Sequence, residues 1–273
     1  MTEARSTVAD LVTRGLDRRE ARWLVEEFAD QQGATTAELE SALARRLSGE
    51  PLQYVIGHWP FRSLDLCVDS RVLIPRPETE ELVEVALAEL DRGDFDAAVI
   101  VDLGCGSGAV GLALLDELRT RGVKAALMAL DASADALEVA RVNARRHGLT
   151  NVTFLHSTWY EELDRSLAGR VNLIVANPPY VSVAEFATAD PVLGYEPRGA
   201  LVADDEDNVA GFADVAHVIG GAPPWLAAGG ALVCEHGEGH REAALAAAAR
   251  AGLRDGRDLD DLSGRARILV ARA

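Results

Sequence analysis

The sequence predicts an α/β fold, in which a parallel sheet covered on both faces by helices follows a small helical unit. Three observations lead to this prediction. From residue 97 onward, apolar strand-like runs alternate with helical patterns, which is typical of βαβ units. A glycine-rich turn follows the first of these strands and precedes a helix. The first fifty residues, in contrast, repeat apolar residues only at helical spacing.

The N-terminal part, residues 1–50, is predicted to form a small helical domain. We expect helices over 6–14, 17–29 and 35–47, the second capped by Asp17 and the third by Thr35. A glutamate follows each of these two caps after three positions, as in a capping box. The apolar residues are expected to form a core, and nothing in this part is typical of catalysis. We therefore expect it to recognise a macromolecular substrate.

Residues 51–76 are expected to form a linker that contains a β-hairpin. The predicted strands are 59–61 and 64–68, with Arg62 and Ser63 at the turn. The linker ends in Ile74-Pro75-Arg76-Pro77-Glu78-Thr79-Glu80, in which two prolines stiffen the chain. Arg76 is expected to line the active-site entrance and to contact substrate, although ordinary charge patterning at a helix start is an equal alternative.

Residues 77–273 are expected to form the α/β domain, which begins with a helix running to about Leu90. We predict strands at 97–103, 125–130, 152–155, 172–176, 231–235 and 267–270, and further helices at 109–120, 133–147, 211–219 and 241–251. Strands in a parallel sheet are covered on both faces, so near-continuous apolar runs are expected.

Composition excludes several classes of protein. The hydrophobic fraction of 48% supports a sizeable core, and the formal charge of −17 argues against nucleic acid as the main partner. No apolar run is long enough for a membrane span, and the N-terminus does not resemble a secretion signal, so we expect a cytoplasmic protein. The three cysteines, Cys67, Cys105 and Cys234, have no metal-ligand spacing, and no metal is expected.

The glycine-rich turn is predicted to bind a cofactor. It consists of Gly104, Cys105, Gly106, Ser107 and Gly108. Glycine permits positive φ and lets a ligand approach the backbone closely. Gly104, Gly106 and Ala109 also match the dinucleotide pattern G-x-G-x-x-A, and Asp131, after the second strand, suits ribose hydroxyls in either class of enzyme. These residues alone leave the cofactor undecided.

A second motif, Asn177-Pro178-Pro179-Tyr180, follows the fourth strand. The two prolines fix the backbone, so the Asn177 side-chain oxygen and the Pro178 carbonyl form a rigid pair of acceptors for an NH₂ group. Tyr180 offers a flat face for a planar substrate. A Pro-Pro turn that merely ends a strand is the alternative interpretation. A nicotinamide enzyme has no particular use for such a pair of acceptors, whereas an enzyme that presents an NH₂ nucleophile to a methyl donor does. S-adenosylmethionine is therefore the favoured cofactor.

Trp159, just past the third strand, is expected to cover an adenine, with a core aromatic as the alternative. No residue is expected to act as a general base, because the proton can leave to water after methyl transfer. His156, His236 and His240 show no catalytic pattern and are expected to be structural or exposed.

Taken together, these segments resemble the class I, Rossmann-like S-adenosylmethionine methyltransferases. Within that superfamily they resemble the protein-(glutamine-N5) methyltransferases that modify peptide chain release factors. The resemblance covers nearly the whole chain and rests on segments 74–80, 102–108 and 177–180, on Asp131 and Trp159, and on Tyr195-Glu196-Pro197. The acceptor motif alone is shared with enzymes that methylate adenine and other amines. The 74–80 segment after a helical domain is the more specific mark.

The resemblance implies a role for each motif. Gly104–Gly108 would wrap the methionine part of the cofactor, Asp131 would hold its ribose, and Trp159 would lie by the adenine. Asn177–Tyr180 would hold the glutamine of the Gly-Gly-Gln loop of a class I release factor. Thr158 departs from the family, where an acidic residue often precedes the tryptophan. An adenine amino methyltransferase, a non-catalytic cofactor-binding module and a nicotinamide oxidoreductase remain as alternatives.

Overall fold

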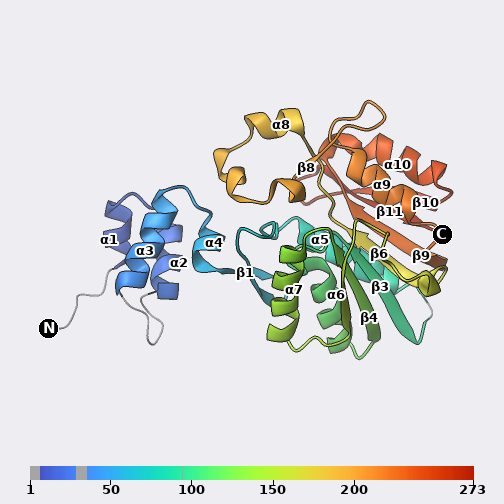
Figure 1. Cartoon of the computed structure of the whole chain (residues 1–273), viewed down its shortest axis with the longest axis horizontal. Coiled ribbons are helices and arrows are strands. Elements are labelled where there is room, and N and C mark those ends of the chain that lie inside the picture. The colour runs from blue at the N-terminus through green and yellow to red at the C-terminus, as the bar shows by residue number, and fades with distance from the viewer. Residues whose placement is uncertain (1–6, 29–35, 94) are drawn as a thin grey trace.

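The computed structural model describes residues 7–28, 36–93 and 95–273. Helices α1 (Val8–Thr13), α2 (Arg18–Phe28) and α3 (Thr36–Leu47) lie together at one end of the molecule, away from the sheet (Figure 1). They pack around a small apolar cluster that includes Leu11, Leu24 and Leu43. The three expected helices are thus confirmed, although Ser6, Ala29 and the expected cap Thr35 lie outside the described residues.

The caps of the first two helices follow from local sequence. The Thr7 hydroxyl accepts a hydrogen bond from the Asp10 amide, and the Asp10 carboxylate accepts from Thr7 in return, which makes a capping box. Asp17 Oδ1 accepts from the Arg19 amide at 2.8 Å, as expected for a cap.

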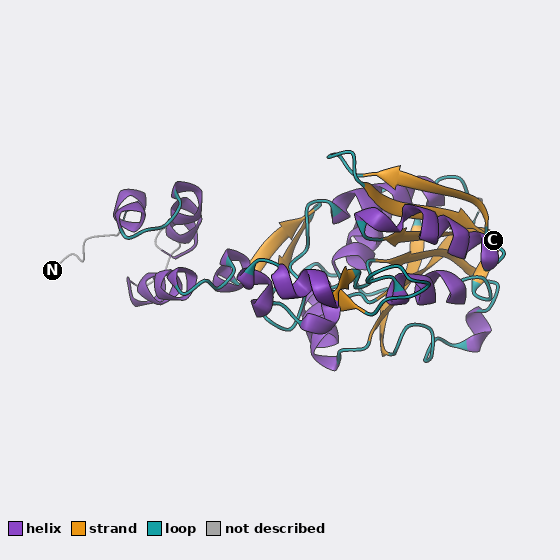
Figure 2. Ribbon diagram, turned by 90° about the horizontal axis from the view of Figure 1, so that it is seen from above, coloured by secondary structure: helices purple, strands orange, loops and turns teal. Residues whose placement is uncertain are grey.

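A short helix that was not expected, α4 (Leu52–Ile56), connects the first helices to the rest of the chain. Five residues are too few to show helical periodicity, and Gly57 ends the helix with φ of +85°. The expected hairpin follows as β1 (His58–Phe61) and β2 (Leu64–Cys67), with Phe61 opposite Leu64. Seen from above, the N-terminal helices extend away from the body of the molecule (Figure 2).

The body is a seven-stranded sheet in the order β10-β11-β9-β6-β3-β4-β5. Five strands of this sheet run parallel: β3 (Ala97–Leu103), β4 (Lys124–Asp131), β5 (Val152–His156), β6 (Val171–Ala176) and β9 (Leu226–Glu235). Each of them contains one of the predicted strands. The sixth predicted strand is β11 (Ala266–Arg272), which runs antiparallel to β9.

Helices cover both faces of this sheet. On one face pack α5 (Thr79–Leu90), α6 (Ala109–Thr120) and α7 (Ala134–Arg146), and on the other α9 (Ala213–Gly221) and α10 (Arg241–Arg250). The two apolar clusters use alternate residues of each strand, with Ile100 on one face of β3 and Val101 on the other. The predicted α/β fold, a largely parallel sheet covered on both faces by helices, is therefore confirmed.

Some elements were not expected. The edge strand β10 (Arg254–Asp260) pairs antiparallel with β11, and five of its seven residues are charged, so it lacks an apolar pattern. Between β6 and α9 the chain forms β7 (Val181–Ser182), α8 (Val183–Thr188), 3₁₀ turns at Pro191–Tyr195 and Arg198–Ala200, and β8 (Val202–Ala203). A further 3₁₀ turn lies at Arg165–Leu167 and another at Glu238–His240.

We retain the division into residues 1–50, 51–76 and 77–273 as a proposal. Leu52 and Val55 of α4 pack into the apolar cluster of the first three helices. Within the residues described, no helix combines the length and the apolar character needed to cross a bilayer.

Candidate active site

The candidate site lies at the carboxyl edge of the parallel strands. Strand β3 has β4 on one side and β6 on the other, so the connections diverge in opposite directions from this point. In open α/β sheets, such a divergence leaves a crevice where ligands bind. The glycine-rich turn follows β3, Asp131 ends β4 and Asn177 follows β6, so three of the predicted motifs meet here.

A cavity of about 500 Å³ opens at this edge. This volume lies within the range of about 300–1,000 Å³ usual for small-molecule sites. The cavity is bordered by Gly104, Gly106, Asp131, Thr158, Trp159, Asn177, Pro179 and Asp214, among others. A narrow extension of about 50 Å³ continues past Arg76, Thr79, Asp102, Cys105 and Ser107. Gly104, Gly106 and Asn177 border both spaces.

The glycine-rich turn is shaped for close approach of a ligand. Gly106 has φ of +54°, and a Cβ built there would meet no atom within 4 Å, so the space above this residue is open. The Cys105 amide donates to the Leu130 carbonyl at 2.9 Å, which ties the turn to β4. Ser107 is buried and its carbonyl accepts from the Asn143 side chain, whereas Gly108 begins α6 without bordering either space.

Asp131 connects the turn to helix α7. One carboxylate oxygen accepts from the Gly106 amide at 2.8 Å, and the other accepts from the Ser133 amide at 2.8 Å. Burial raises the pKa of Asp131, and the two amides partly oppose this effect. Each oxygen keeps a lone pair for a further donor. The side chain can thus accept ribose hydroxyls while it holds the turn in shape.

Trp159 borders the cavity and faces the glycine-rich turn, since a Cβ at Gly104 would lie 3.6 Å from its ring. The backbone at Trp159 has φ of +49°, and the Ser157 hydroxyl donates to the Trp159 carbonyl at 3.0 Å. Asp214, from α9, also borders the cavity and lies near the Trp159 side chain. Sequence reasoning did not identify this carboxylate, because it comes from a distant helix.

Asn177 is anchored by one side of its amide. Its Nδ2 donates to Thr79 Oγ1 at 3.2 Å, and Thr79 Oγ1 in turn donates to Glu235 Oε2 at 2.9 Å. Among the described residues, none donates a hydrogen bond to Asn177 Oδ1. This oxygen is therefore the part of the amide that remains able to accept from a ligand.

The other residues of the acceptor motif lie differently. Pro179 borders the cavity, Pro178 is buried, and the Tyr180 hydroxyl donates to Glu235 Oε1 at 2.9 Å. Pro178 and Tyr180 do not border the two spaces described above. Burial and the nearby Glu235 raise the pKa of Tyr180. The stacking of Tyr180 on a substrate stays a prediction, and its observed contact is with Glu235.

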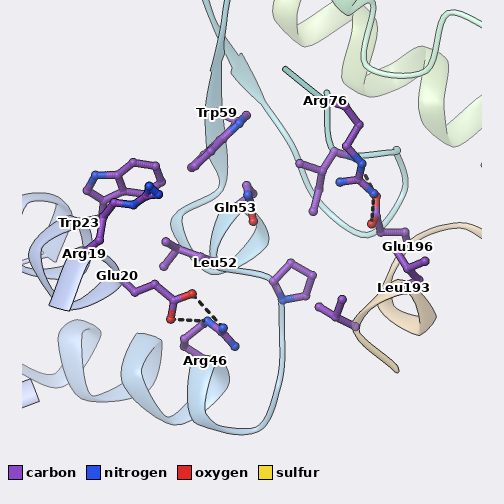
Figure 3. A pocket seen from close by; sticks show the side chains of 13 residues that line it. Arg19, Glu20, Trp23, Arg46, Leu52, Gln53, Trp59, Arg76, Leu193 and Glu196 are labelled. Carbon is purple, nitrogen blue, oxygen red and sulfur yellow. Dashed lines mark hydrogen bonds and ion pairs between the residues drawn. The ribbon is translucent and has the colours of Figure 1, made fainter. Parts of the chain in front are cut away.

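Arg76 stands between the narrow extension and an outer groove of about 550 Å³. Its Nη2 contacts Glu196 Oε1 at 2.5 Å, and the other oxygen of the buried Glu196 accepts from the Ile74 amide at 3.0 Å. Figure 3 shows the outer groove between the N-terminal helices, which contribute Arg19, Glu20, Trp23 and Arg46, and the loop that carries Leu193 and Glu196.

Asp102, at the end of β3, is a buried carboxylate that sequence reasoning did not assign. Its Oδ2 accepts from the Gly111 amide at 2.9 Å. A Cβ at Gly111 would lie 2.6 Å from this oxygen, so glycine is required for the close approach of α6 to the strand. Burial raises the pKa of Asp102 to about 7.

We expect this pKa to make stability depend on pH. The folded-state value of about 7 exceeds the reference value of 3.8, so the folded protein keeps a proton that the unfolded chain has released. Stability should therefore fall as pH rises from about 4 to about 7, by at most about 4 kcal/mol. Urea unfolding of the wild type and of Asp102→Asn between pH 4 and 8 measures this. Parallel profiles for the two proteins would contradict the assignment.

The histidines singled out in the sequence lie outside the cavity. His236 is buried and its Nε2 contacts Asp258 at 2.6 Å, while His240 contacts the Ala210 carbonyl at 2.8 Å and His156 the Ala132 carbonyl at 2.8 Å. In the part of the chain that the structure describes, no group of three or more His, Cys, Asp or Glu side chains is arranged to hold a metal ion. The expectation that no metal takes part stays a prediction.

Comparison with known proteins relates this geometry to a family. A model described as a methyltransferase domain matches residues 94–254. The release factor glutamine methyltransferase of Bordetella pertussis is 40% identical over 281 residues, covering 98% of this chain and 98% of that protein. The release factor glutamine methyltransferase of Aliivibrio fischeri is 40% identical over 195 residues, covering 71% of this chain and 64% of that protein.

A solved structure shares the fold at low identity. The Thermus thermophilus 16S rRNA N2 G1207 methyltransferase, described in complex with AdoMet and guanosine, matches with a TM-score of 0.52 and 16% identity. The match covers 79% of this chain and 49% of that protein. At this identity, the likeness establishes the fold alone.

Proposed function

Because the chain belongs to the family of release factor glutamine methyltransferases, we propose that it methylates the glutamine of the Gly-Gly-Gln motif in class I peptide chain release factors. The methyl group is transferred from S-adenosylmethionine to the side-chain amide N5. The observation that carries this proposal is the anchoring of Asn177, whose Nδ2 is held by Thr79 while Oδ1 stays able to accept from a ligand.

The cavity at the sheet edge fits S-adenosylmethionine. The open backbone at Gly106 suits the methionine part, Asp131 offers two acceptor oxygens for the ribose, and Trp159 supplies an aromatic face for the adenine. Asp214, beside Trp159, offers an acceptor for the adenine amine, a role that Thr158 fills less well. The chain's membership of a methyltransferase family supports a methyl donor as the cofactor.

The protein's contribution to the reaction is to orient a weak nucleophile. An amide nitrogen is a poor nucleophile because its lone pair is delocalised into the carbonyl group. In the proposed complex, Asn177 Oδ1 and the Pro178 carbonyl each accept a hydrogen bond from the NH₂ group of the glutamine, at about 2.7–3.2 Å, and turn the nitrogen toward the cofactor cavity. The Pro178 ring is buried and borders neither space, so only its carbonyl takes part. Bound S-adenosylmethionine supplies an electrophilic methyl group. The two oxygens also stabilise the positive charge that develops on nitrogen, and the proton leaves afterwards to water.

The outer groove is the proposed docking site for the rest of the release factor. Arg76 borders both this groove and the narrow extension, so the proposed path of the bound protein runs from the groove past Arg76 to Asn177. Arg46 pairs with Glu20 at 2.9 Å, and Arg76 pairs with Glu196. Arg19 borders the same groove, and among the described residues it has no ion-pair partner. Its guanidinium acts electrostatically on Asp17 without forming an ion pair, and it suits an acidic side chain on the bound segment.

We expect Arg19→Glu to raise the KM for an intact release factor several-fold, because reversing the charge repels that acidic side chain. The KM for a short Gly-Gly-Gln peptide, which does not reach the groove, should stay the same. Arg18→Glu is the matched control, since Arg18 is the neighbouring residue on α2 and does not border the groove. Equal effects of the two substitutions, or none from Arg19→Glu, would exclude docking at this place.

The proposal implies an enzyme of the cytoplasm, with neither a nucleic acid nor a membrane as a partner. The charge of −17 supports this for nucleic acid, since phosphate backbones attract basic surfaces. An adenine amino methyltransferase is the alternative that shares the acceptor motif.

Mass spectrometry separates the two. The protein is incubated with S-adenosylmethionine and either a class I release factor or an adenine-containing oligonucleotide. We expect one added methyl group on the Gly-Gly-Gln peptide and none on the oligonucleotide. Methylation of the oligonucleotide alone would refute the proposal, as would methylation of the release factor at another residue.

A further inference from the structure

Two residues outside the acceptor motif, Thr79 and Glu235, form a chain of hydrogen bonds with the Asn177 amide. Thr79 begins α5, and Glu235 ends β9, yet their side chains meet behind Asn177 at 2.9 Å. Glu235 is 2% exposed and Thr79 is 4% exposed, so water does not supply alternative partners for these groups. The Glu235 carboxylate connects both polar side chains of the acceptor motif. Asn177 reaches Oε2 through Thr79, and the Tyr180 hydroxyl donates to Oε1.

The hydrogen-bond inventory fixes the direction. A carboxylate only accepts, so Thr79 must give its single hydroxyl hydrogen to Glu235. The Thr79 oxygen then has only lone pairs for Asn177 and selects the Nδ2 side of the amide. The amide of Asn177 consequently keeps Oδ1 available to a ligand. If Thr79 donated to Asn177 instead, the amide would turn over and present NH₂ to the substrate's NH₂.

We propose that Glu235 and Thr79 form a relay that positions Asn177, so that the buried carboxylate decides which face of the amide the substrate meets. The inference rests on the proposed function and adds two positioning residues to it. Neither group takes a proton from the substrate.

The charged and titratable groups around Glu235 make the relay sensitive to pH. Tyr180, from the acceptor motif, and Thr79 donate to it, Arg267 of β11 lies near enough to favour its ionised form, and Glu78 disfavours it. Burial is the largest effect and raises the pKa of Glu235. A protonated Glu235 can donate to Thr79 and so reverse the relay. Activity should therefore be lost on the acidic side at a higher pH than an exposed glutamate would require.

Thr79→Val tests the relay, because it keeps the shape of the side chain and removes the hydroxyl. We expect kcat on a Gly-Gly-Gln peptide to fall roughly 10- to 100-fold, as for other misoriented catalytic groups. The Kd for S-adenosylmethionine should change less than twofold. Thr79→Ser restores the hydroxyl and should recover most of the activity. The remaining activity of Thr79→Val should no longer fall with acid at the pH where the wild type falls.

Thr120→Val is the matched control, since Thr120 makes an ordinary helix contact to the Asp116 carbonyl at 2.9 Å, away from the site. It should leave kcat unchanged. Glu235→Gln combined with Thr79→Val should cost little more than Thr79→Val alone, because both act through one relay.

The outcomes distinguish the two levels of inference. If the wild type fails to methylate the glutamine, the proposed function fails. If the wild type is active but Thr79→Val keeps kcat within twofold, or if the two substitutions multiply in effect, the relay is refuted while the proposed function stands.

Discussion

Asn177→Ala should lower kcat for methylation of a Gly-Gly-Gln peptide on the order of 10²- to 10³-fold, the usual loss when one preorganised polar partner of a transition state is removed. The substitution deletes the acceptor that orients the glutamine nitrogen. It leaves Gly106, Asp131 and Trp159 in place, so the affinity for S-adenosylmethionine should change less than twofold. Steady-state kinetics and isothermal titration calorimetry measure the two effects separately.

Asn172→Ala provides the control for this variant. Asn172 lies on β6, the strand that Asn177 follows, and its Oδ1 accepts from the Val99 amide at 2.8 Å, outside the cavity. The change in chemistry is identical, and we expect some loss of stability with an unaltered kcat. A kcat for Asn177→Ala close to that of Asn172→Ala would show that the acceptor motif does not hold the nucleophile.

Asp131→Ala should weaken the binding of S-adenosylmethionine by roughly 10- to 100-fold, which corresponds to the loss of one or two hydrogen bonds to a charged group. The effect has two physical sources. The ribose loses its acceptor, and the Gly106 amide loses the partner that holds the turn at 2.8 Å. Calorimetric titration of the purified variant with S-adenosylmethionine measures the affinity.

Asp164→Ala is the control for this variant, because it removes the same kind of turn hydrogen bond without removing a cavity residue. Asp164 Oδ1 accepts from the amide two residues ahead, that of Ser166, at 2.8 Å, just as Asp131 accepts from Ser133. It does not border the cavity. Unchanged affinity is expected for Asp164→Ala, and an equally unchanged affinity for Asp131→Ala would remove Asp131 from the cofactor site.

Much of the sheet could be predicted because each element carries its own local signal. Strand β3 (Ala97–Leu103) and helix α6 (Ala109–Thr120) were predicted with the bounds observed, since an apolar run, a glycine-rich turn and a helical pattern follow one another. The hairpin was also confirmed, because its turn separates two apolar stretches. Helix α4 is too short to show a period, and β10 is charged because it lies at the edge of the sheet.

The site could be predicted only in part, for a related reason. Residues within motifs, such as Gly106 and Asn177, border the same cavity as expected, because the carboxyl ends of neighbouring parallel strands lie side by side. Thr79 and Glu235 are 156 positions apart, and no sequence pattern joins them. One signal did exist for Glu235, since it is a carboxylate at the end of a fully buried strand segment. Asp214 had no comparable signal, because it looks like an ordinary first-turn residue of α9.

The single side chain of Arg76 borders both the groove and the narrow extension. If the groove holds the partner protein as proposed, docking and methyl transfer take place a fixed distance apart. Such an enzyme selects its substrate by the distance between the docked segment and the glutamine. We expect it to methylate a glutamine at the correct distance from the docked segment. An identical tripeptide nearer to or farther from that segment should not be methylated. Moving the Gly-Gly-Gln loop by a few inserted residues should therefore abolish modification without altering the loop itself.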